Sequence, residues 1–306
     1  MPIDTYAPRI NQVADHISAD LAGDLSLTHL ADLAGFSQFH FHRVFKQYTG
    51  ENLNRFVVRR RLERATQLMR VTARLPLTRI AIACGFESSS DFSRAFKRQF
   101  GLAPSSWDRL TPLTPLEDSK IRQTPAGFTL YTRAELAAMT RNNEFDVRIE
   151  QRAAERLAMI RITNAYANPE RIMAATETLL DWAGRVGVAR PQLVGMSEDD
   201  PDVTPAALCR YDVCVAMPEG IDAALEADMS WRHFPACTLA MVHCAGDIVR
   251  VDRVWQFLWR HWLPHSGYLP DNLPAMERYV RAPREIGWLT FDIDCCVPIV
   301  FDTGGG

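Results

Sequence analysis

A repeat with a period of about fifty residues places the strongest constraint on how this chain folds. Residues 25–46 (LSLTHLADLAGFSQFHFHRVFK) match residues 75–97 (LPLTRIAIACGFESSSDFSRAFK), with one extra residue in the second copy. A stretch that recurs at a constant spacing is one supersecondary unit used more than once. The N-terminal part of the chain is therefore predicted to contain the same small unit twice.

Each copy has the pattern of two short helices joined by a tight turn. In the first copy Ser26 and Ser37 stand where helix N-caps are needed, and Gly35 stands where the first helix ends with positive φ. In the second copy Pro76 stands at the helix start and Gly85 takes the place of Gly35. The second helix of each copy carries two phenylalanines four residues apart, which face the core: Phe41 with Phe45, and Phe92 with Phe96. This pattern predicts two helix-turn-helix units.

A longer helix is predicted between the two units, over Leu53–Val71. It carries the cationic run Arg59-Arg60-Arg61 and, one turn further on, Arg64. These arginines have two interpretations, which are contacts with DNA phosphates or a solvated helix face.

At this point the chain resembles the AraC/XylS-type regulators over about residues 8–110. The resemblance rests on Ala31-x3-Gly35-Phe36, Phe41-x-Arg43-x-Phe45-Lys46, Gly50, Arg61-Leu62, Ile80-Ala81-x3-Gly85-Phe86 and Phe92-x-Arg94-x-Phe96-Lys97-x3-Gly101-x2-Pro104. It implies that the second helix of each unit enters the major groove, with the two helices about 34 Å apart on one face of double-stranded DNA. The DNA-binding candidates that it implies are Phe39, His42, Arg43, Lys46, Ser89, Ser90, Asp91, Arg94 and Lys97.

Three of these candidates have alternatives. Arg43 and Arg94 either pair with guanine or serve as phosphate or intramolecular partners. Asp91 either accepts from a cytosine amine or stabilises a helix N-terminus. The small serines of the second unit leave its base preference open.

A second repeat, with a period of about eighty residues, organises the C-terminal part. Residues 157–160 (LAMI) match 239–242 (LAMV), and residues 211–213 (YDV) match 291–293 (FDI). These apolar runs are predicted to be strands. Helical stretches, roughly 169–186 and 251–262, lie between them.

This part resembles the GyrI-like (gyrase-inhibitor-like) effector-binding domains, from about Phe145 to Asp302. The resemblance rests on Trp255-x2-Leu258-x3-Trp262-Leu263-Pro264-x-Ser266-Gly267-Tyr268, followed by Glu277-x-Tyr279. It implies a duplicated strand-helix-strand fold with a ligand groove between its halves and an acidic residue near the centre. The ligand-binding candidates are Glu277, Tyr279, Trp255, Trp259, Trp288 and Tyr166.

Aromatic faces and a carboxylate suit a hydrophobic or cationic ligand. The alternatives are that Trp255, Trp259 and Trp262 form a core stripe and that Glu277 is an ordinary surface carboxylate. The chain also departs from the family's Gly-x-Tyr pattern, since it has Asn164-Ala165-Tyr166.

Charge supports a division into two parts. Residues 1–112 carry 15 lysines and arginines against 10 acidic residues, whereas the remainder carries 19 against 27. A basic part joined to an acidic one is typical of a DNA-binding module with a partner domain of another kind. The seven cysteines contain no C-x-x-C pair, and the N-terminus has no secretory pattern, so a cytoplasmic protein with reduced thiols is expected.

The expected protein is multidomain, with an all-α DNA-binding domain at 1–112, a proline-containing linker at 113–144 with a short helix near Arg133–Thr140, and an α+β domain with an antiparallel sheet at 145–306. Its expected function is that of a transcription regulator that binds an operator and senses a small molecule, with RNA polymerase as a further candidate partner. No cofactor, metal site, membrane segment or enzyme activity is expected. The alternatives are a small-molecule hydrolase or a protein-interaction module in the C-terminal domain.

Overall fold

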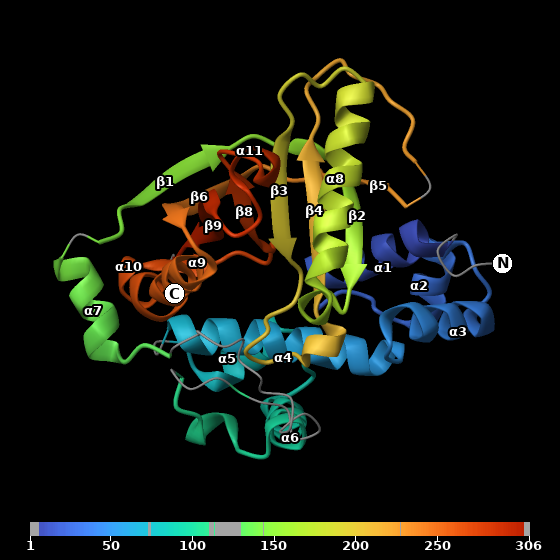
Figure 1. The fold of residues 1–306 in the computed structure, drawn as a ribbon. Helices are drawn as coiled ribbons and strands as arrows, with labels where there is room; N and C mark the ends of the chain where they lie inside the picture. The colour runs from blue at the N-terminus through green and yellow to red at the C-terminus, as the bar shows by residue number, and fades with distance from the viewer. Residues whose placement is uncertain are drawn as a thin grey trace.

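The computed structural model describes residues 6–72, 75–109, 113, 130–142, 144–226 and 228–302. Its N-terminal part is helical and its C-terminal part combines a sheet with helices, as expected (Figure 1). None of the helices in these ranges has the length and apolar character that crossing a membrane requires.

The helical part consists of two similar units joined by the longest helix of the described chain. Its helices are α1 (Ala7–Ala19), α2 (Leu27–Ala34), α3 (Gln38–Thr49), α4 (Leu53–Val71), α5 (Leu77–Ala83) and α6 (Ser89–Phe100). The predicted bounds of the joining helix are confirmed by α4.

The turn chemistry predicted for these units is confirmed. Ser26 Oγ accepts a hydrogen bond from the His29 amide, and Ser37 Oγ accepts one from the His40 amide, both at 3.3 Å. Gly35 and Gly85 end the first helix of their units with φ of 66° and 82°. The four paired phenylalanines are fully buried, so each unit has its own aromatic core: Phe41, Phe45, Phe92 and Phe96.

The C-terminal part is built on one antiparallel sheet. In chain order its elements are α7 (Arg133–Arg141), β1 (Val147–Arg152), β2 (Glu155–Thr163), α8 (Pro169–Arg185), β3 (Gln192–Ser197), β4 (Arg210–Ala216), β5 (Ser230–Phe234), β6 (Cys237–Gly246), α9 (Ile248–Phe257), α10 (Leu263–Ser266), β7 (Tyr268–Pro270), β8 (Ala275–Tyr279), α11 (Pro283–Ile286) and β9 (Phe291–Phe301). The strands follow the order β1-β6-β9-β8-β3-β4-β2-β5, and β7 pairs with β9.

The sheet has two equivalent halves, which confirms the duplication expected from the second repeat. Helix α8 packs on β2 and β4, and helix α9 packs on β6 and β9 (Figure 1). Strands β3 and β8 pair with each other and join the halves. The seam between the halves therefore runs between these two strands.

The helix expected over residues 251–262 differs in its course. Helix α9 begins at Ile248, and after Phe257 the chain makes a π-helical turn over Leu258–Trp262 before α10. A π turn adds a residue to the helical turn, so side chains beyond it rotate away from the stripe that an α-helix would give. Trp262, the last residue of this turn, stacks on Tyr268, with ring centroids 6.2 Å apart, and packs against the same core as Trp255 and Trp259.

The expected short helix of the connecting segment is α7. Thr132 and Glu135 form a capping box at its start, and Leu136 and Met139 are buried in the core that α9 covers. Val71, the last residue of α4, lies in the same core. The two parts of the chain thus share apolar contacts. Residues 114–129 of the expected linker lie outside the described residues.

Candidate functional site

The predicted DNA-contacting stripe of α3 is open to solvent. Phe39 is 82% exposed although it is a large apolar side chain, and His42, Arg43 and Lys46 are exposed beside it. The local contact of Arg43 is with His40, whose Nδ1 lies 3.4 Å from Nη2 of the guanidinium. This stripe therefore lies outside the hydrophobic core and is accessible to a binding partner.

The corresponding stripe of α6 is held by local contacts. Ser90, Arg94 and Lys97 are exposed, while Ser89 and Asp91 are half-buried. Ser88 Oγ donates to Asp91 Oδ2 at 2.7 Å, and Arg94 pairs with the same carboxylate. Asp91 thus lies where it stabilises the N-terminus of α6, and Arg94 has to leave this partner in order to reach a base.

A carboxylate lies at the seam of the sheet. Glu277 on β8 is the register partner of Gly195 on β3. Tyr211 Oη donates to Glu277 Oε2 at 2.7 Å, and Trp255 Nε1 donates to Oε1 at 3.2 Å. Burial raises the pKa of Glu277, and these two hydrogen bonds oppose that shift.

The contact between Tyr211 and Glu277 depends on Gly195. A Cβ atom at Gly195 would lie 1.8 Å from Tyr211 Oη, so no other residue leaves room for the phenol to cross β3. Sequence reasoning missed Tyr211. The signal for it was present in the second repeat, where Tyr211 matches Phe291, so the hydroxyl is what distinguishes the two copies.

The surrounding side chains fill the site. The space between Ile172, Gly195, Tyr211 and Tyr279 has no room for a water molecule among the described residues. Tyr166 is 41% exposed, and its hydroxyl lies 3.0 Å from Ser197 Oγ at the end of β3. A ligand that enters this space must displace side chains, whereas Glu277, which does not line it, is half-buried. We call the site formed by Glu277, Tyr211, Trp255, Tyr279, Tyr166 and Gly195 the seam site.

The structure brings four of the six ligand-binding candidates to the seam site, namely Glu277, Trp255, Tyr279 and Tyr166. Trp259 packs against the core that α9 covers. Trp288 is half-buried after α11, and among the described contacts it has none with Glu277.

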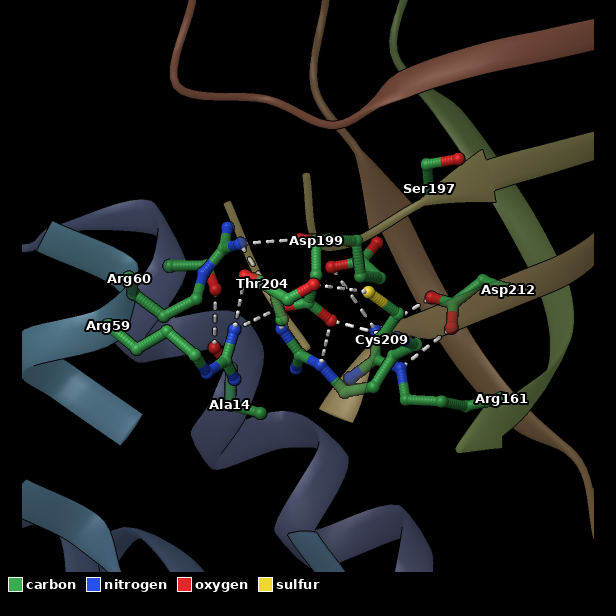
Figure 2. A network of polar contacts seen from close by, with 12 residues as sticks. Ala14, Arg59, Arg60, Arg161, Ser197, Asp199, Thr204, Cys209 and Asp212 are labelled. Carbon is green, nitrogen blue, oxygen red and sulfur yellow. Dashed lines mark hydrogen bonds and ion pairs between the residues drawn. The ribbon is translucent and has the colours of Figure 1, made fainter. Parts of the chain in front are cut away.

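A buried ionic network joins the two parts of the chain (Figure 2). Its centre is Asp199, just after β3. Asp199 accepts from Arg59 Nη1 of α4 at 2.7 Å and from Arg210 Nε of β4 at 2.8 Å. Burial alone would raise the pKa of Asp199, but Arg210 and Arg59 hold it well below its usual value. Arg59 also bonds Glu51 and Glu63 of the helical part, at 2.8 and 2.9 Å.

A second branch of this network reaches α1. Arg161 of β2 donates to Asp212 of β4 at 2.7 and 2.6 Å and to Asp15 of α1 at 2.7 Å. Arg232 of β5 donates to the same Asp212 at 2.6 Å and pairs with Glu198 at 2.5 Å. This set, of which Asp15, Arg60 and Arg232 are half-buried and the others buried, we call the interdomain network: Asp15, Glu51, Arg59, Arg60, Glu63, Arg161, Glu198, Asp199, Thr204, Arg210, Asp212 and Arg232.

Contacts within the chain correct the interpretation of the α4 arginines as a solvated face. Arg60 donates to the Glu198 carbonyl, Arg61 to the Leu21 carbonyl, and Arg64 to the carbonyls of Pro270 and Asp271. With Arg59 buried at Asp199, the cationic run of α4 binds its own chain. It is not a solvated face.

Comparisons with known proteins agree with this two-part architecture. A family described as a GyrI-like small molecule binding domain matches residues 145–300, and a helix-turn-helix domain family matches residues 30–109. The right origin-binding protein of Escherichia coli (strain K12) is 40% identical over 85 residues, which are 28% of this chain and 29% of that protein. The chain therefore spans less than a third of this relative.

Two further similarities fall on the helical part. The multiple antibiotic resistance protein MarA of Salmonella typhimurium is 30% identical over 103 residues, which cover 34% of this chain and 80% of MarA. The crystal structure of a transcriptional regulator from Chromobacterium violaceum, of the AraC type, is 30% identical and covers 32% of this chain and 88% of that one, with a TM-score of 0.31.

Proposed function

Because the chain belongs to the GyrI-like small molecule binding family and carries an AraC-type helix-turn-helix domain before that domain, we propose that it is a transcription regulator. It would bind a DNA operator and respond to a small hydrophobic or cationic effector. The DNA-binding domain would span 1–112, the linker 113–144 and the effector-binding domain 145–306. The observation that carries the proposal is the combination of two recognition stripes with exposed cations and a partly buried carboxylate among aromatic rings. The match to a helix-turn-helix domain family supports a regulator that binds DNA.

The DNA half of the proposal assigns roles by side-chain chemistry. Phe39 meets a thymine methyl, and Arg43 and Arg94 pair with guanine O6 and N7. Lys46 and Lys97 lie on the same exposed stripes and neutralise phosphates. Because α3 and α6 belong to one chain, one protomer reads two neighbouring segments of the major groove.

The effector half rests on the state of Glu277. Its carboxylate sits in a low-dielectric surrounding with two neutral donors, and no cation bonds it among the described residues. An organic cation that replaces the Tyr211 hydroxyl would supply the missing positive charge, and the rings of Trp255 and Tyr279 would cover its apolar part. Tyr166, at the exposed end of the site, would contact a ligand on its way in.

Selection from a random duplex library tests the DNA half. At about 150 mM salt the purified protein is expected to recover one asymmetric site, bound at least about a thousandfold better than bulk DNA. Recovery of nothing beyond weak, steeply salt-dependent binding, with and without hydrophobic cations, would contradict the proposal.

Thermal unfolding with a model cation tests the effector half. Tetraphenylphosphonium is expected to raise the melting temperature, because a ligand that binds only the folded state must stabilise it. Triphenylphosphine oxide, similar in rings but without a charge, is expected to raise it much less. Equal shifts with both compounds would mean that Glu277 takes no part, and the site would then be a neutral apolar one.

The proposal also includes contact between the DNA-bound regulator and RNA polymerase, and a location in the cytoplasm.

A further inference from the structure

Strand β4 presents neighbouring residues to different parts of the molecule. Successive side chains of a strand point to opposite faces of the sheet. Tyr211 points to the seam site, where it bonds Glu277 at 2.7 Å. Its neighbours Arg210 and Asp212 point to the other face, where they bond Asp199 at 2.8 Å and Arg161 at 2.7 Å. Side chains on both faces of this strand thus form polar contacts.

From these two neighbours the contacts continue into the DNA-binding part. Asp199 bonds Arg59 of α4, and Arg161 bonds Asp15 of α1, each at 2.7 Å. Asn272, which follows β7, adds hydrogen bonds from its Nδ2 to the carbonyls of Ser18 and Ala19 at the end of α1. The effector-binding part therefore bonds both α1, which precedes the first helix-turn-helix unit, and the joining helix α4. Figure 2 shows the contacts of Arg59 and Asp199.

The charges of this network are buried, so each of them depends on its partner. The side chains of Asp199 and Asp212 are 0% exposed, and that of Arg161 is also 0% exposed. A buried ion that loses its partner is strongly unfavourable, so these pairs do not slide gradually past one another. A displacement of the start of β4 must either be resisted or break the set.

We propose that β4 couples the seam site to the DNA-binding part. Arg210 and Asp212 are positioning residues: they hold α4 and α1 in the orientation that leaves both recognition stripes open, and a ligand that pushes Tyr211 aside releases that hold. This coupling rests on the proposed function, because it gives the effector of the seam site its route to the operator.

The structure offers a ligand-free substitute for an occupied site. In Gly195→Ala the new Cβ would lie 1.8 Å from Tyr211 Oη, so the phenol must leave Glu277. Gly184→Ala in α8 is the matched control, since a Cβ there meets nothing within 4 Å. The double variant Gly195→Ala/Tyr211→Ala removes the displaced ring and is expected to return towards the wild-type behaviour.

Two substitutions break the network directly. Asp199→Asn keeps the shape of the side chain and removes the charge that Arg59 and Arg210 share. Its control is Glu155→Gln, which removes a carboxylate that bonds Arg278 at 2.7 Å within the effector-binding part alone. If Gly195→Ala does not fold, Asp212→Asn tests the same step on β4 itself.

Two readouts on the full chain separate the coupling from the proposed function. Small-angle X-ray scattering without DNA is expected to show a larger radius of gyration for Gly195→Ala and Asp199→Asn, and no change for the controls. Fluorescence anisotropy with the selected operator is expected to show at least about fivefold weaker binding for these two variants, and a change of less than about twofold for the controls.

Wild-type values for Gly195→Ala, Asp199→Asn and Asp212→Asn in both readouts would overturn the coupling. If no operator is recovered from the library, the DNA half of the proposed function fails while the scattering still decides on the coupling. If tetraphenylphosphonium does not bind but Gly195→Ala loosens the molecule, the effector class is wrong and the route through β4 stands.

Discussion

Gly195 and Glu277 face each other directly across β3 and β8, the two strands that join the halves of the sheet. The seam site is therefore made by both halves: Tyr211 reaches Glu277 from β4 of the first half and Trp255 reaches it from α9 of the second. A shift of one half against the other changes both hydrogen bonds together. The proposed ligand, if it replaces these hydrogen bonds, is expected to alter how the two halves meet.

Loss of the seam carboxylate is expected to remove the preference for cations. In Glu277→Gln the side chain keeps its size but cannot ionise, so the dissociation constant for tetraphenylphosphonium should rise at least about tenfold. Binding of triphenylphosphine oxide should change little. Isothermal titration calorimetry measures both, and equal losses for the two compounds would indicate damage to the site's shape instead.

Two cations of the first recognition stripe are expected to behave differently. Arg43→Ala should weaken operator binding by about 1–3 kcal/mol and relax the preference at one base pair. Lys46→Ala should weaken binding to all sequences alike and reduce the salt slope by about 1. Anisotropy titrations over a salt series and a panel of single-base operator variants distinguish the two effects. Arg185→Ala, on the exposed face of α8, is the control.

Replacement by alanine is expected to destabilise the protein more at Gly85 than at Gly35, the two turn glycines. Both have positive φ, so alanine costs about 1–2 kcal/mol at either position. At Gly85 a Cβ would also lie 2.0 Å from the Leu21 carbonyl oxygen, whereas at Gly35 the nearest atom is Arg9 Nη1 at 3.8 Å. Gly85→Ala should therefore be the more destabilising by at least about 2 kcal/mol in urea denaturation. Similar losses would show that the backbone near Leu21 yields readily.

Stability is expected to depend on pH through Glu63. Burial outweighs the attraction of Arg60 and Arg59 and raises its pKa from 4.5 to about 7. The folded chain then holds this proton more tightly than the unfolded chain, so the contribution of Glu63 to stability falls as the pH rises from 4.5 to 7. Urea midpoints for Glu63→Gln should fall less over this window than those of the wild type, whereas Glu226→Gln, an exposed change, should follow the wild type.

Local patterns predicted most of the helical part. Ser26, Ser37 and Gly35 mark helix ends by chemistry that acts within a few residues, so their structural roles can be deduced from the sequence. The phenylalanines spaced by four residues likewise face the core as expected. In the sheet, the second repeat predicted strands where β2, β4, β6 and β9 lie, because both copies of the unit carry the same apolar pattern. Glu277 was singled out by the resemblance to the GyrI-like domains.

The contacts between distant segments could not be predicted in this way. The partner of Arg59 is Asp199, 140 residues further along the chain, and nothing in the local pattern of α4 distinguishes a buried arginine from a phosphate ligand. Tyr211 belongs to the seam site only because β3 and β8 pair in one register, which places Gly195 beside Glu277. The π-helical turn after Phe257 likewise left no mark in the spacing of the tryptophans.

Helix α4 also bears on how such proteins can be recombined. Its Arg59 is neutralised by Asp199 and its Val71 lies among the core residues beneath α9. A chimera that exchanges the sensor at the linker would leave this guanidinium without its counter-ion and this valine without its packing partners, however well the new sensor folds. A graft that preserves these contacts must therefore carry α4 together with the β3–β4 connection.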